Sequence, residues 1–186
     1  MLYLIRHTTP DIAHGICYGQ LDVNLGSSFE AEAAAICDFL PKLDLVIASP
    51  SLRTERLASR LAIRCEMKTD ARLLEKHFGT WEGVAWSDIP RSEIDAWALD
   101  IMNHAPSGGE SANQVMLRAD ALIREITRMP EKNIALISHA GTMRAMLALL
   151  ADIPLVHALD WEISYGAVIV VNLQAQVRHP AQNSTK

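Results

Sequence analysis

The amino-acid sequence predicts an α/β fold, a three-layer sandwich with a mostly parallel sheet in the middle. Short apolar segments of strand-forming residues alternate with longer segments of helical spacing, and the strand segments are apolar throughout. Strands of that kind belong to sheets that helices cover on both faces. No internal repeat or low-complexity linker interrupts the 186 residues. We therefore expect one domain over residues 1–186, with residues 72–109 as a small subdomain over the sheet ends.

The first half of the chain supplies three of the expected strands. In order, the elements are strand Leu2–Ile5, the long loop Thr8–Gly26, helix Phe29–Leu40, strand Leu43–Ser49, a helix opened by Pro50, and the weaker strand Glu66–Thr69. Ser28 is suited to cap the first helix, and Pro41 ends it. A loop as long as the first one is often functional.

The second half begins with an irregular segment and then returns to regular elements. The expected order is loop Arg72–Ala85, helix Pro90–Asn103, a long helix from Ser111 to Met129, strand Ile134–Ser138, helix Met143–Ala151, strand Ala167–Leu173, and the polar tail 174–186. Ser111 is the expected cap of the long helix. The alternation supports the sandwich.

Composition limits the classes of function. The formal net charge of −5 argues against non-specific binding to nucleic acid or to an anionic membrane. An anionic small molecule stays open as a substrate, because a local cluster of arginines can dominate one cavity. Three cysteines without a CxxC pair indicate reduced thiols. With no signal peptide or membrane-length apolar segment in view, we expect a cytoplasmic protein, and a homodimer remains open.

Polar side chains follow three of the expected strands. Arg6 and His7 end the first strand, Arg53 lies one helical turn after the second, and His139 follows the strand that ends at Ser138. The carboxyl ends of parallel strands meet at one edge of a sheet, where ligands bind in open α/β folds. The sequence therefore predicts a donor-rich, positively charged site at that edge.

Such a site suits a phosphoryl group, whose oxygens need several charge-assisted donors in a fixed arrangement. The helix after His139 adds backbone N–H groups. A neutral imidazole can attack phosphorus, and neighbouring arginines favour the neutral form. The leaving oxygen needs an acid, and Glu75 and Glu82 are both available on the middle loop.

Taken one at a time, these residues also have ordinary explanations. A single His is most often a structural residue, Arg53 on a helix is usually a solvated charge, and Glu75 on a loop is usually surface. What favours function is their place at the ends of separate strands and on a loop flanked by glycines.

Four segments together resemble the motif set of the histidine phosphatase superfamily, the phosphoglycerate mutase-like group. They are Leu-Ile-Arg-His at 4–7, Ser-Pro-Ser-Leu-Arg at 49–53, Leu-Glu-Lys-His-Phe-Gly-Thr-Trp-Glu-Gly at 74–83, and Ser-His-Ala-Gly at 138–141. They span most of the chain in the family's order. The resemblance implies a phosphoglycerate mutase-like fold.

The resemblance also implies roles. His7 would be the phosphorylated nucleophile, and Glu75 would be the proton donor that later activates water. Arg6, Arg53 and His139 would bind the phosphoryl group, and Gln20 and Ala140 would contact substrate. No metal or organic cofactor is implied.

Three positions depart from the family pattern. Thr8 stands where the family usually has Gly, and a β-branched residue there restricts the backbone and crowds the phosphate, unless its hydroxyl adds a donor. Ala13 replaces the usual Asn, and Leu57 replaces the usual Thr. None of these changes removes the nucleophile, the arginines or the acid.

The short segment between the middle and last motifs favours a phosphatase over a mutase. Segments 6–10, 17–22, 78–83 (followed by Trp86) and 106–111 resemble α-ribazole phosphatases of cobalamin synthesis. Trp81, Trp86 and Trp97 could line a site for a nucleoside-like leaving group, although Trp97 at helical spacing favours the core. The alternatives are a broad-specificity sugar or small-molecule phosphatase, a mutase-type phosphotransferase, and a non-catalytic domain that binds a phosphorylated ligand.

Overall fold

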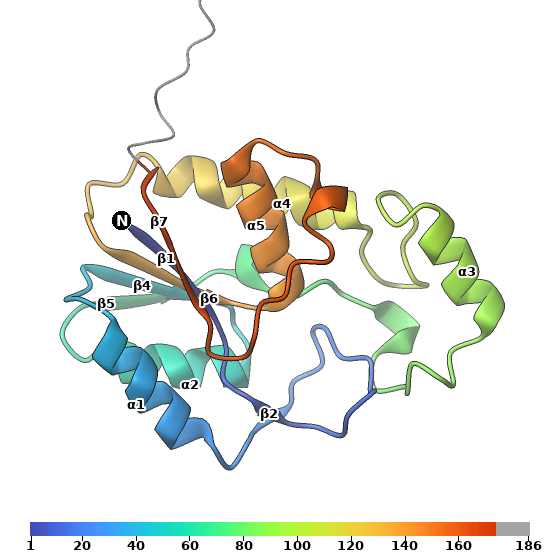
Figure 1. The fold of residues 1–186 in the computed structure, drawn as a ribbon, viewed down its shortest axis with the longest axis horizontal. Helices are drawn as coiled ribbons and strands as arrows, with labels where there is room; N and C mark the ends of the chain where they lie inside the picture. The colour runs from blue at the N-terminus through green and yellow to red at the C-terminus, as the bar shows by residue number, and fades with distance from the viewer. Residues whose placement is uncertain (174–186) are drawn as a thin grey trace, which may run out of the picture.

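A five-stranded sheet forms the centre of the molecule in the computed structural model, which describes residues 1–173 (Figure 1). The strands are β1 (Leu2–Arg6), β4 (Leu45–Ala48), β5 (Glu66–Thr69), β6 (Ile134–Ser138) and β7 (Val168–Val171). Their order is β5-β4-β6-β1-β7. The first four run parallel and β7 is antiparallel to β1, so the prediction of a mostly parallel sheet is confirmed.

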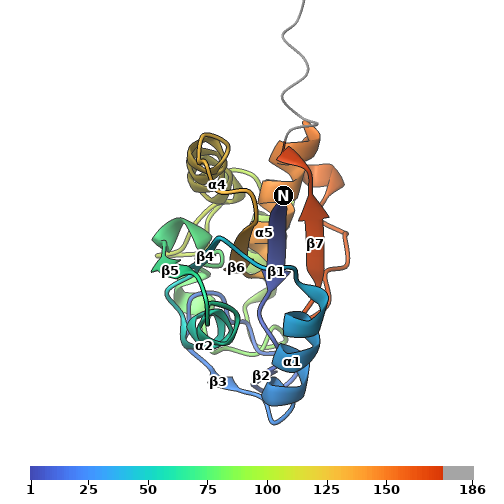
Figure 2. The same cartoon turned by 90° about the vertical axis from the view of Figure 1, so that its left-hand side faces the viewer.

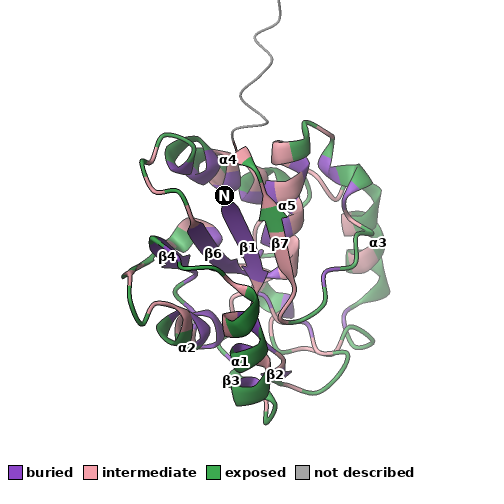
Figure 3. Ribbon diagram, turned by 60° about the vertical axis from the view of Figure 1, so that its left-hand side comes forward, coloured by how far each residue is buried: buried purple, intermediate pink, exposed green. Residues whose placement is uncertain are grey.

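Helices cover both faces of the sheet (Figures 1 and 2). The helices are α1 (Phe29–Phe39), α2 (Leu52–Leu61), α3 (Arg91–Leu99), α4 (Ala112–Ile126) and α5 (Ala140–Ala151). In β1, Leu2 and Leu4 pack with α4 and α5, whereas Tyr3 and Ile5 pack with α1 and α2. The central strands are accordingly buried, as Figure 3 shows, and the predicted three layers are confirmed.

The region over one end of the sheet is built differently. The short 3-10 helices Ala71–Leu73 and Gly79–Trp81, together with α3, lie between β5 and α4 in the chain. Figure 1 shows α3 beside the sheet and not on it. A separate apolar cluster of Cys17, Trp81 and Ile89 holds this region together.

The long loop Thr8–Gly26 contains structure that its sequence did not predict. Two short strands, β2 (Pro10–Asp11) and β3 (Asn24–Leu25), pair antiparallel within it, and Ile16 bridges to Ala85. The loop is therefore fixed at its base and tied to the middle loop, close to the end of β1.

Serine was predicted as the N-terminal cap of two helices, α1 and α4. Ser111 caps α4 through a reciprocal pair of hydrogen bonds with Gln114, as predicted. The prediction for Ser28 was wrong: its hydroxyl donates to the Glu32 carboxylate and accepts from no backbone N–H. Glu32 also accepts from Thr9 N–H, which ties α1 to the loop after β1.

Several helices and strands end at residues other than those predicted. Helix α3 ends at Leu99 and not at Asn103, because the Asp100 side chain accepts from Asn103 N–H and closes a turn there. Helix α4 ends at Ile126, β4 is limited to Leu45–Ala48, and β7 to Val168–Val171. The polar tail predicted for residues 174–186 lies outside the described residues. Within residues 1–173, no helix is long and apolar enough to cross a membrane.

Candidate active site

Three strand ends converge as the sequence predicted. Arg6 of β1 lies in register with Ser138 of β6, and His7 N–H donates to the Ser138 carbonyl (3.0 Å). Ser49 N–H donates to the Ile137 carbonyl of β6 (3.0 Å). A cavity of about 350 Å³ lies at this edge, and we call it the central cavity. Its walls include Arg6, His7, Arg53, Glu75, His139, Tyr18, Trp86 and Tyr165.

Within residues 1–173, only one ring nitrogen of His7 makes a hydrogen bond. Its Nδ1 lies 2.8 Å from the Thr8 carbonyl oxygen, which can only accept, so Nδ1 carries the proton and Nε2 has the lone pair. Burial lowers the pKa of His7 to about 3, with help from the charges of Arg53 and Arg6 and against the hydrogen bond to Thr8. The ring is therefore neutral at pH 7, as a nucleophile requires.

Thr8 and Ala13 lie outside the central cavity. Thr8 is fully buried, and its backbone does not have the positive φ that would require glycine, since Asp152 alone has it among the non-glycine residues described. The Thr8 hydroxyl has no partner among the described residues. Ala13 is exposed, and it lines a neighbouring cavity with Trp86 and Tyr165. The backbone thus accommodates the threonine.

Arg53 is fully buried and fixed by backbone carbonyls. Its Nη1 donates to Leu21 O (3.0 Å), and its Nη2 donates to Gly19 O (2.7 Å). Nη2 also donates to Nδ1 of His139 (3.2 Å), so His139 Nε2 carries the proton and donates to Ser49 Oγ (2.9 Å). Burial, followed by the charges of His7 and Arg53, holds the pKa of His139 well below its usual value.

Arg6 is held by a pair of residues that the sequence analysis did not identify. Its Nη1 donates to Ile163 O (2.6 Å), and its guanidinium lies 3.7 Å from the centre of the Tyr165 ring. The Tyr165 hydroxyl is hydrogen-bonded to that of Tyr18 (2.6 Å). Tyr18 belongs to a segment that resembled the family, but residues around Tyr165 carry no pattern that would have indicated a role.

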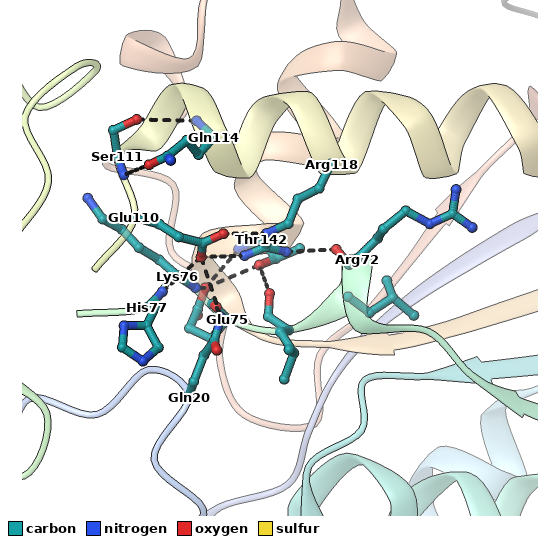
Figure 4. A network of polar contacts seen from close by, with 12 residues as sticks. Gln20, Arg72, Glu75, Lys76, His77, Glu110, Ser111, Gln114, Arg118 and Thr142 are labelled. Carbon is teal, nitrogen blue, oxygen red and sulfur yellow. Dashed lines mark hydrogen bonds and ion pairs between the residues drawn. The ribbon is translucent and has the colours of Figure 1, made fainter. Parts of the chain in front are cut away.

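Glu75 lies at the N-terminus of α5. Its Oε1 accepts from Lys76 N–H (2.9 Å) and Thr142 N–H (3.0 Å), as Figure 4 shows. Its Oε2 accepts from Gly141 N–H (2.9 Å). A Cβ atom at position 141 would lie 2.5 Å from Glu75 Oε1, so only glycine allows this approach. The carboxyl group is thereby fixed at the wall of the central cavity.

Gln20 is not brought into the central cavity. Its amide nitrogen donates to the Glu75 carbonyl oxygen (3.0 Å) and to Glu110 Oε2 (3.4 Å), as Figure 4 shows. It therefore supports the backbone of the loop that carries Glu75. Ala140 begins α5 and lines a second cavity beside the first. A direct substrate contact for these two residues stays a prediction.

Glu82, the other candidate acid, is a structural residue. Its two oxygens accept from the backbone N–H groups of Gly19, Gln20, Leu21 and Phe78. Burial acts to raise its pKa, but these four donors lower it overall. Glu82 joins the first loop to the middle loop and does not line the central cavity.

The three tryptophans form one aromatic cluster, with Trp81 5.8 Å and Trp86 6.4 Å from Trp97 between ring centres. Trp86 lines the central cavity, Trp97 lines the second cavity, and Trp81 is buried beneath them. The expected aromatic wall is therefore divided between two cavities.

Comparison with known proteins agrees with this geometry. A model of the histidine phosphatase superfamily (branch 1) matches residues 2–181. Glucosyl-3-phosphoglycerate phosphatase of Mycobacterium tuberculosis is 30% identical over 171 residues, covering 82% of this chain and 76% of that protein. Adenosylcobalamin/alpha-ribazole phosphatase of Salmonella typhimurium is 23% identical over 183 residues, covering 92% and 90%.

A solved structure shares the fold. The α-ribazole phosphatase of Shigella flexneri superposes with a TM-score of 0.83 at 23% identity, over 92% of this chain and 90% of the other. The family model covers nearly the whole chain. The chain therefore belongs to the histidine phosphatase superfamily.

Proposed function

We propose that this protein is a metal-independent phosphomonoesterase that acts through a phosphohistidine at His7. The observation that carries the proposal is the state of the His7 ring: its Nδ1–H is held by the Thr8 carbonyl, and the neutral ring lines a cavity together with Arg6 and Arg53. A neutral, oriented nitrogen beside two guanidinium groups is what in-line attack on a phosphoryl group requires.

In the first half of the reaction, the His7 Nε2 lone pair forms the N–P bond while the bond to the leaving oxygen breaks. Arg6, Arg53 and His139 hold the phosphoryl oxygens. Glu75 in its protonated form gives its proton to the leaving oxygen. The hydrogen bond from Nδ1–H to Thr8 O stabilises the positive charge that develops on the ring.

In the second half, water attacks phosphorus and the N–P bond breaks. Glu75, now a carboxylate, takes a proton from that water, which returns both residues to their starting forms. The products are the free alcohol and inorganic phosphate.

For the natural substrate, α-ribazole 5′-phosphate is our first proposal, with a role in cobalamin synthesis in the cytoplasm. It is supported by the sequence segments that resemble that subfamily and by a relative aligned over 92% of this chain. A phosphorylated sugar acid is the second candidate, favoured by the 30% identity to the mycobacterial phosphatase. Initial rates of phosphate release, measured side by side with α-ribazole 5′-phosphate and with glucosyl-3-phosphoglycerate, decide between the two candidate substrates.

The activity itself is tested with 4-nitrophenyl phosphate in the presence of a chelator. The expected result is phosphate release that the chelator leaves intact, that is lost in His7→Ala, and that persists in the matched control His104→Ala, whose side chain is exposed. Activity that survives in His7→Ala would contradict the proposed nucleophile. Isomerisation of a phosphoglycerate without phosphate release would favour a mutase.

A further inference from the structure

A second cavity, of about 280 Å³, adjoins the central cavity, and we call it the side cavity. The two share Glu75, Phe78 and Arg144. The other walls of the side cavity are apolar for the most part, with Trp97 of α3 and Val115 of α4 among them. It therefore lies next to the proposed reaction site, and its lining is more apolar.

One ammonium group is buried at this cavity. Lys76 is only 8% exposed, and its Nζ has no hydrogen-bond partner among residues 1–173. The nitrogen lies 5.0 Å from the centre of the Trp97 ring and 5.6 Å from that of Phe78. Figure 4 shows the Lys76 side chain extending away from the Glu75 hydrogen bonds, with no contact drawn to its end. The negative charges of Glu110 and Glu75 act on this ammonium, but neither carboxylate makes a hydrogen bond to Nζ. A buried ammonium without a hydrogen-bond acceptor favours a ligand that supplies one.

A second donor at the same cavity is also unsatisfied. The indole Nε1–H of Trp97 is buried and has no partner in the described part of the chain. Buried donors are nearly always paired in folded proteins, so two orphans at one cavity indicate a ligand that supplies acceptors. Lys76 and Trp97 both line this cavity, and a carboxylate offers two acceptor oxygens.

The position of the side cavity indicates which part of a substrate would enter it. This step rests on the proposed function, in which Glu75 protonates the leaving oxygen. The alcohol must then lie on the Glu75 side of the phosphorus atom. Glu75 lines both cavities, so an alcohol bound next to it would extend from the central cavity into the side cavity.

We propose that the side cavity is the leaving-group subsite, and that it takes an alcohol with an apolar body ending in a carboxylate, bound by Lys76 Nζ and Trp97 Nε1. The alcohol of α-ribazole 5′-phosphate has no carboxylate, so this subsite favours a carboxylate-bearing ester, such as the second candidate substrate, over the first. The apolar walls bury the body, and the two donors select the charge at its end. Arg144 adds positive charge where the two cavities meet, and its Nε is already bonded to the Trp161 carbonyl.

Three esters with the same reacting end test the proposal: 2-phenylethyl phosphate, 2-(4-carboxyphenyl)ethyl phosphate and 2-(4-carbamoylphenyl)ethyl phosphate. Two methylene groups insulate the leaving oxygen, so the esters differ mainly in the distal group. We expect kcat/KM for the carboxylate to exceed that for the unsubstituted ester by roughly ten- to a hundredfold, mainly through KM. A carboxamide as good as the carboxylate would overturn the assignment to an anion.

Variants then locate the effect. In Lys76→Met the preference for the carboxylate should fall to near unity, and in Trp97→Phe it should fall by a smaller factor. Lys42→Met removes an exposed lysine and should leave the preference unchanged. A preference that persists in Lys76→Met would overturn the proposal, provided that thermal melting shows both variants folded.

The experiment distinguishes failure of the proposed subsite from failure of the proposed phosphatase activity. If all three esters are hydrolysed equally well, the subsite is wrong and the phosphatase stands. If none is hydrolysed and 4-nitrophenyl phosphate is also untouched, the proposed function is wrong, and the subsite that depends on it is overturned as well.

Discussion

The central cavity and the side cavity share Glu75, yet their polar groups are held in different ways. In the central cavity, the ring of His7 and the guanidinium of Arg53 are fixed by backbone carbonyls, and Arg53 in turn orients His139. In the side cavity, Lys76 Nζ and Trp97 Nε1 have no partner among the described residues.

The difference indicates how the site divides its work. A phosphoryl group is the same in every substrate, so donors fixed in advance by the main chain can meet it without further ordering. The alcohol varies between substrates, and unsatisfied donors in an apolar cavity select among alcohols by what each one supplies. In this account the central cavity carries out the reaction, and the side cavity selects the substrate.

After the loss expected in His7→Ala, Glu75→Gln should have the largest effect, because it removes the proton for the leaving oxygen. We expect a loss of roughly 10²- to 10⁴-fold in kcat with alkyl phosphates and a much smaller loss with 4-nitrophenyl phosphate, whose leaving group needs little help. The matched control is Glu82→Gln, which should reduce thermal stability more than activity. Equal losses with good and poor leaving groups would remove the acid role from Glu75.

Gly141→Ala tests whether the close approach of Glu75 to α5 matters. The added Cβ would lie 2.5 Å from Glu75 Oε1, so the carboxyl group must move. A displacement of about 1 Å can cost roughly a hundredfold in rate. The loss should again be larger for alkyl than for aryl phosphates. Full activity with alkyl phosphates would show that the position of Glu75 is not critical.

Lys76→Met should stabilise the ligand-free protein at pH 7 by about 1 to 3 kcal/mol, because it removes a buried ammonium that has no hydrogen-bond partner among the described residues. Burial lowers the pKa of Lys76 to about 8, against the charges of Glu110, Glu75 and Cys17, which raise it. The folded state thus binds the proton less tightly than the unfolded chain.

The destabilising effect of Lys76 is consequently full below about pH 8 and disappears as the pH rises towards the value of an unfolded lysine. Urea unfolding at pH 7 and pH 10 measures this. The gain from Lys76→Met should shrink at the higher pH. A variant less stable than the parent protein at pH 7 would show that the ammonium is already compensated.

A change of pH from 7 to 5 should have the smallest effect on kcat/KM. The pKa of His7 is about 3 in the free enzyme, so the ring stays neutral when the pH falls from 7 to 5. After correction for ionisation of the substrate, kcat/KM should change by less than about twofold from this group over that range. An inflection near pH 6.5 that belongs to His7 would place it in a solvated environment.

Much of the central cavity could be predicted from the sequence, because apolar strands followed at once by charged residues place those residues at one edge of a parallel sheet. Loop conformations could not be predicted in this way. Glu75 and Glu82 are equivalent candidates in the sequence, and only the fold brings Glu75 to the start of α5. Likewise, no periodicity places Tyr165 beneath Arg6 or buries Lys76 next to Trp97.

The most direct test is to trap the covalent intermediate. The protein is mixed with a phosphate monoester, quenched in alkali, digested and examined by mass spectrometry for phosphorylation in the peptide that contains His7. The expected result is an acid-labile, alkali-stable phosphoryl group on His7 that is absent from His7→Ala. Turnover without a phosphorylated His7, or with the phosphoryl group on another residue, would contradict the account.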